Sequence, residues 1–115
     1  MTRSSAFDGF PALTKGTAIP NLFFAAVLPK LRAPGDLLAF LWASRLIQEQ
    51  RGEARFVTAD QLWAEPGAAE SFEAIGGGRA GLDAGLDACA EAGALLSLEL
   101  AGPAGPVAVY FVHNA

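Results

Sequence analysis

The segment Asp36–Gln50 constrains the fold more than any other part of this 115-residue sequence. A helix over this segment would be apolar around most of its circumference, so other elements must cover it on several sides. We therefore expect it to be the central buried helix of the domain, capped by Asp36. Its buried face should carry Leu37, Phe40, Leu41, Ser44 and Ile47, widened by Leu38, Trp42 and Leu46.

Turn signals divide the rest of the chain into short elements. Leucines alternate with Ser97 and Glu99 just before a Gly- and Pro-rich turn, which predicts a β-hairpin. The predicted order after the central helix is a very short strand Phe56-Val57, a helix with the capping box Thr58 and Gln61 that ends at Pro66-Gly67, a helical turn Glu70–Ile75, a helix Arg79–Ala92 and the hairpin Leu95–Val112.

This order is typical of a winged helix, in which a helix-turn-helix pair is followed by a β wing. We predict a mainly α fold with a small β wing, extended at its N-terminal side by a strand at Thr17–Ile19 and a helix beginning near Asn21. Residues 1–15 form an N-terminal arm without regular periodicity, and residues 16–115 form the domain.

The charge distribution argues against strong DNA binding. Bases outnumber acids between residues 15 and 55, whereas acids dominate between residues 56 and 115. Asp83, Asp87 and Glu91 share one face of the helix that would enter a DNA groove, and phosphate contacts need Lys or Arg instead. Any weak DNA contact should come from Lys30, Arg32, Arg45, Arg51 and Arg55.

The sequence offers little for catalysis, cofactors or metals. Gly76-x-Gly78-x-x-Gly81 matches the dinucleotide-binding pattern, but no strand is predicted just before it, so we expect a loop and no cofactor. Cys89 and His113 are the only thiol and imidazole; they form neither a zinc set nor a convincing catalytic pair. We expect a buried structural Cys89 and no enzymatic activity.

Aromatic residues near the N-terminus suggest a protein interface. Phe23 and Phe24 lie about 100° apart on a helix and fit one narrow core face poorly. These aromatic residues could instead all close the core. The alternative that we favour is a homo-oligomer, with a dimer preferred, whose interface contains Phe7, Phe10, Ile19, Phe23 and Phe24.

The segment Ile19–Phe24, with Leu28 and Leu31 behind it, resembles the N-terminal domain of DnaD-like replication initiation (primosomal) proteins. The similarity extends over most of the chain, through the central helix, Phe56-Val57-Thr58, Glu91–Leu96 and Tyr110-Phe111. The resemblance implies a winged helix that mainly self-associates, with replication proteins as further partners. In that family a second domain binds DNA, so its DNA-binding residues find no match in this sequence.

These observations lead to three hypotheses about function. The first is an assembly domain of a DnaD-like replication initiation protein, and the alternative is a winged-helix DNA-binding transcriptional regulator. A small enzyme or cofactor protein is third. The sequence shows no signal peptide and no apolar run long enough for a membrane span, so we expect a cytoplasmic protein without membrane contact.

Overall fold

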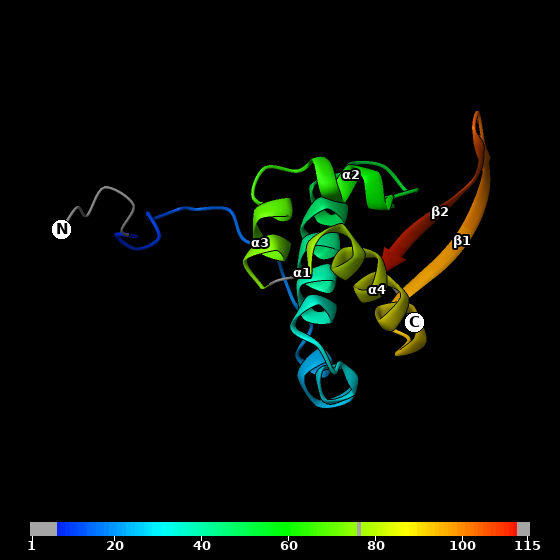
Figure 1. The fold of residues 1–115 in the computed structure, drawn as a ribbon. Helices are drawn as coiled ribbons and strands as arrows, with labels where there is room; N and C mark the ends of the chain where they lie inside the picture. The colour runs from blue at the N-terminus through cyan, green and yellow to red at the C-terminus, as the bar shows by residue number, and fades with distance from the viewer. Residues whose placement is uncertain (1–6, 76, 113–115) are drawn as a thin grey trace.

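The computed structural model describes residues 7–75 and 77–112, and within them helices are followed by an antiparallel β-hairpin (Figure 1). This confirms the mainly helical class and the C-terminal hairpin, in a winged-helix-like arrangement. The elements are the π-helical turn η1 (Phe23–Val27), the 3-10 turn η2 (Leu28–Lys30), α1 (Pro34–Glu49), α2 (Ala59–Ala64), α3 (Ala68–Ala74), α4 (Gly78–Glu91), β1 (Leu95–Gly102) and β2 (Gly105–Val112).

Helix α1 is the central element, as predicted, and it contacts α2, α3, α4 and β2 (Figure 1). Its closest neighbour is α4, which approaches over the small residues Gly35 and Ala39. At Gly85 in α4, an added Cβ would lie 2.5 Å from the Gly35 carbonyl oxygen, so only glycine permits this contact. The two backbones therefore pack almost directly against each other.

This close approach overturns the prediction that Leu41 is a core residue, because Leu41 is 39% exposed. Phe40, Ser44 and Ile47 are buried, as predicted, and the small residues Ala39 and Ala43 complete the buried face in place of Leu41. Hydrophobic periodicity favours the large residues, whereas α4 packs where glycine and alanine let it come near. Leu41 instead lines a shallow apolar groove beside Ile19 and Trp42.

The start of α1 also differs from the prediction. The helix begins at Pro34, after an extended Ala33, and Asp36 lies within the first turn. One carboxylate oxygen of Asp36 accepts hydrogen bonds from the backbone N–H groups of Arg32 and Ala33, each at 3.1 Å. Pro34 is well suited to the first helical position, which explains why the helix begins there. Asp36, in the first turn, stabilises this start through its hydrogen bonds to the preceding backbone N–H groups.

The predicted strand Thr17–Ile19 is wrong, since the structure assigns no strand there. Instead, the side-chain amide of Gln48 binds the backbone of Ala18, donating to its carbonyl at 2.7 Å and accepting from its N–H at 2.9 Å. One amide therefore provides the two bonds that a neighbouring strand would have made. The helix expected from Asn21 is confirmed in part: residues 21–30 are helical throughout, mostly as the π-helical turn η1 and the 3-10 turn η2.

Other local predictions are confirmed. Thr58 and Gln61 form the expected capping box, with bonds of 3.1 and 2.9 Å in the two directions. The strand expected at Phe56-Val57 is reduced to a single bridge, in which Val57 and Tyr110 exchange two backbone hydrogen bonds. Helices α3 and α4 lie where the sequence places them, within one or two residues.

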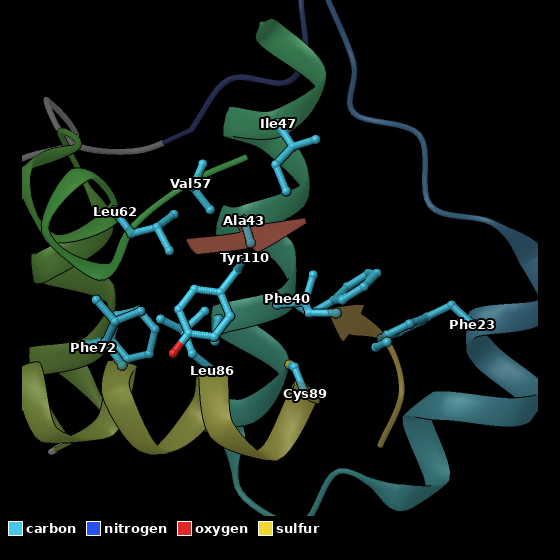
Figure 2. Close-up of a cluster of buried hydrophobic side chains, with 14 residues drawn as sticks. Phe23, Phe40, Ala43, Ile47, Val57, Leu62, Phe72, Leu86, Cys89 and Tyr110 are labelled. Atoms are coloured by element: carbon cyan, nitrogen blue, oxygen red, sulfur yellow. The ribbon is translucent and has the colours of Figure 1, made fainter. Parts of the chain in front are cut away.

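The core is formed where α1, α4 and the base of the hairpin meet (Figure 2). Phe72, Leu62 and Leu86 are completely buried on one side of it. On the other side, the ring of Phe23 stacks on Phe40 with 4.4 Å between ring centroids, which fastens η1 to α1. The core therefore holds the N-terminal segment and the hairpin in place on the helices.

Candidate interaction surface

Cross-strand pairing sorts the hairpin residues onto two faces, because successive side chains in a strand point to opposite sides. One face carries the polar Ser97 and Glu99, paired with Tyr110 and Ala108. The other face is entirely apolar. Its three cross-strand pairs are Leu96 with Phe111, Leu98 with Val109, and Leu100 with Val107.

On the first face, Tyr110 and Ala108 of β2 are turned toward the helices, whereas Ser97 and Glu99 of β1 are exposed. Tyr110 lies in the core beside Phe72 and Leu86, and Ala108 packs against that core (Figure 2). Burial raises the pKa of the Tyr110 hydroxyl, and the carboxylates of Asp87 and Asp83 raise it further. These contacts fix which side of the hairpin faces inward.

On the apolar face, Val109 is buried and Phe111 is half-buried, whereas the other four residues are exposed to solvent. Most antiparallel sheets with one solvated side keep their apolar residues inward, whereas this hairpin leaves four large apolar residues of one face in solvent. The leucine face, as we call it, consists of Leu96, Leu98, Leu100 and Val107, whose exposed fractions are 38, 52, 42 and 39%. Glu99 in β1 is the one charged residue of the two strands. Little charge therefore opposes contact between the leucine face and another apolar surface.

A cleft of about 330 Å³ separates the hairpin from α2 and α4. Arg79 lies in it and is held by Asp60 at 2.9 Å and by Asp83 at 3.1 Å. These hydrogen bonds, that to Asp60 first, raise the pKa of the Arg79 guanidinium. Asp83, Asp87 and Glu91 are exposed, as predicted, so the outer face of α4 is acidic.

The structure does not gather the basic candidates for DNA contact into one surface. Lys30 and Arg32 precede α1, whereas Arg51 and Arg55 follow it. The 16 residues of α1 span roughly 24 Å, so the two pairs lie at opposite ends of the helix. Between them, Arg45 is paired with Glu49 and Glu65 and lies over the Trp42 ring.

The five predicted interface residues fall into different environments. Phe7, Phe10 and Phe24 are exposed, at 69, 83 and 56%, and Phe7 and Phe10 touch edge to face. Phe23 is buried against Phe40 and Ile19 is half-buried on the core, so these two do not belong to an exposed surface. The described part of the arm projects away from the helices (Figure 1).

The remaining sequence candidates are placed as follows. Helix α3 precedes the glycine pattern, of which Gly76 lies outside the described residues, so the strand required by a dinucleotide site is replaced by a helix there. Cys89 is buried, as predicted, with its thiol 3.3 Å from the Asp36 carbonyl oxygen; burial raises its pKa to about 12. His113 lies outside the described residues.

What sequence reasoning missed is the leucine face. The alternation of Leu96, Leu98 and Leu100 was visible, but alternation alone does not tell which face is inward. Tyr110 on the opposite strand was the available signal. It pairs with Ser97, so both side chains lie on the same face of the hairpin, and the leucines lie on the other. Because Tyr110 enters the core, the leucines point away from it.

No family model matches this chain, and neither a curated protein nor a solved structure shows significant similarity to it. Within residues 7–75 and 77–112, no helix has the length and apolar character needed to cross a membrane. Among the same residues, no three His, Cys, Asp or Glu side chains come together as metal ligands would.

Proposed function

We propose that this chain is an assembly module that self-associates through exposed apolar surface. The observation that carries the proposal is the outward orientation of the leucine face. Water-exposed apolar patches on small domains commonly mark protein interfaces. A hairpin that leaves Leu96, Leu98 and Leu100 exposed on one face is suited to contact with another protein.

Energetics set the scale of this association. Full burial of a leucine is worth about 1.5–3 kcal/mol, so covering a half-exposed leucine contributes roughly 1 kcal/mol. Association costs several kcal/mol in lost translational and rotational freedom. The leucine face alone therefore supports a weak, concentration-dependent dimer, and Phe7 and Phe10 of the arm would strengthen it.

The resemblance to DnaD-like proteins gives this assembly a context. We assign the fold to the winged-helix type and propose that the oligomer serves DNA replication initiation, with replication proteins as further partners and the cytoplasm as its location. The order of helices and hairpin supports this assignment. DNA contact in such an assembly would be weak or indirect.

The alternative, a DNA-binding transcriptional regulator, has the same order of elements in its favour but lacks the required charge. The helix that would enter the groove presents Asp83, Asp87 and Glu91, and its one base, Arg79, is engaged by two carboxylates. Phosphate binding requires several free cations on one surface. Fluorescence anisotropy with a labelled duplex at about 150 mM salt separates the two; sub-micromolar binding would favour the regulator.

The test of self-association is light scattering across micromolar protein concentrations. Leu98→Glu places a charge in the middle of the leucine face and should shift the protein to monomer. Ile75→Glu is the matched control, because Ile75 has similar exposure but lies at the end of α3. A wild-type chain that stays monomeric at every concentration would overturn the proposal.

A further inference from the structure

The free edge of β1 is the starting point. Tyr110 in β2 uses its backbone N–H and C=O to bind Val57, at 2.8 and 2.9 Å, so these groups point away from β1. In an antiparallel ladder, the backbone N–H and C=O groups of two paired residues point either toward each other or both away from each other. These two arrangements alternate from one residue pair to the next along the strand. The backbone groups of Ser97, the partner of Tyr110, and of Glu99 therefore point away from β2 as well.

The two edges of the hairpin differ in how their backbone groups are covered. On β2, Val57 occupies the edge at Tyr110, and Pro106 has no N–H to offer. Along β1, the register is continuous, without a bulge, proline or lysine, and no backbone group within the described ranges binds Ser97 or Glu99 from outside the hairpin. An unguarded edge of this kind is a template for another strand.

The sequence of this edge is self-complementary. Leu96-Ser97-Leu98-Glu99-Leu100 has the same pattern of apolar and polar residues in both directions. We propose that a second copy of the chain pairs with this edge, β1 against β1, antiparallel about a two-fold axis at Leu98. Leu98 then faces Leu98 of the other copy, Leu96 faces Leu100, and Ser97 faces Glu99, within a sheet ordered β2-β1-β1-β2.

Charge and face together select this register. A shift by one residue would turn one leucine face toward the polar side of the other hairpin. A shift by two in one direction would place Glu99 opposite Glu99, which is unfavourable, and in the other direction would shorten the overlap. In the proposed register, each carboxylate meets a serine hydroxyl, and all leucines remain on one face.

The hydrogen-bonding geometry fits as well. Ser97 and Glu99 have the outward-pointing groups, so each of the two symmetry-related Ser97–Glu99 pairs exchanges both of its N–H···O bonds. The Leu98 pair is then of the non-hydrogen-bonded type, in which side chains come closest. This arrangement deepens the proposed function and rests on it, since it specifies how the copies meet.

Disulfide trapping tests the register. Residues in non-hydrogen-bonded pairs have Cα atoms about 4.5 Å apart, within the range that a disulfide spans. Leu98→Cys should therefore form a covalent dimer under mild oxidation, and Leu100→Cys, two residues away on the same face, should do so at least tenfold more slowly. Mixing Leu96→Cys with Leu100→Cys should give the mixed dimer. The native Cys89 is buried and can stay in place.

A backbone substitution tests the edge itself. Ser97→Pro removes an N–H that points away from β2, so the hairpin keeps its own bonds, while Ser97→Ala retains the N–H as a control. We expect Ser97→Pro to raise the dissociation constant of the dimer at least tenfold with an unchanged far-UV circular dichroism spectrum. Ser97→Ala, which loses only the serine hydroxyl contacts, should raise it by no more than about fivefold.

The outcomes separate the two proposals. A monomeric wild-type chain overturns both. A wild-type oligomer that Ser97→Pro does not weaken, with Leu98→Cys trapped no faster than Leu100→Cys, overturns the edge pairing and leaves self-association in place. In that case the copies meet through the leucine faces or the N-terminal arms. If Ser97→Pro changes the circular dichroism spectrum, the cysteine comparison alone decides.

Discussion

Gly85→Ala is predicted to destabilise the protein even though alanine is the better helix former. The new Cβ would lie 2.5 Å from the Gly35 carbonyl oxygen and 2.9 Å from the Ala39 Cβ. Since the first of these belongs to backbone, α1 and α4 must separate by roughly 1 Å to restore ordinary contact. That separation loosens the contact around which the core is built.

The magnitude follows from two opposing effects. Overpacking a well-packed core costs about 1–3 kcal/mol and more when backbone must move, whereas replacing glycine by alanine in a helix gains about 1 kcal/mol. Because the clash at Gly85 is with backbone, we place the net loss at about 2 kcal/mol in the free energy of unfolding. Gly81→Ala provides the matched control in the same helix. Its Cβ would meet Phe72 at an ordinary 3.6 Å, so it should stabilise by up to about 1 kcal/mol.

Urea denaturation followed by circular dichroism at 222 nm measures both variants. Opposite signs for Gly85→Ala and Gly81→Ala would support the packing described for α1 and α4. A Gly85→Ala protein as stable as the wild type would refute it, because the helices would then have room that the structure does not give them.

Three further predictions concern single side chains. Ser44→Ala should raise the free energy of unfolding by about 1 kcal/mol in the same assay, because the Ser44 hydroxyl is buried and has no hydrogen-bond partner among the described residues. Thr58→Ala should lower it by about 1 kcal/mol through loss of the capping bond to the Gln61 N–H. The Cys89 thiol should resist a thiol reagent at pH 8 unless the protein unfolds. Since its pKa is raised from 9.0 to about 12, the stability it contributes is fully present below pH 9 and is lost as the pH rises toward 12, which a series of urea titrations from pH 8 to 11 would measure.

The features that the sequence predicted correctly depend on residues close to one another along the chain. The Thr58 and Gln61 box, the inward face of α4 and the hairpin turn all follow from local spacing. Spacing also predicted the burial of Phe40, Ser44 and Ile47 in α1, but it did not predict that Ala39 is buried and Leu41 exposed. That part depends on the contact between Gly35 and Gly85, which joins residues about 50 positions apart and leaves no periodic signal. The orientation of the leucine face likewise depended on where Tyr110 is anchored.

The same contrast between local and distant contacts has a consequence for folding. β1 and β2 are joined by a short turn and can pair within microseconds, whereas the docking of α4 on α1 must wait for a large loop to close. The hairpin can thus present its leucines and its open strand edge before any core exists to hold it. Chains that refold at high concentration should meet one another at this stage, so the yield of refolded protein should fall as concentration rises, and Leu98→Glu should restore it.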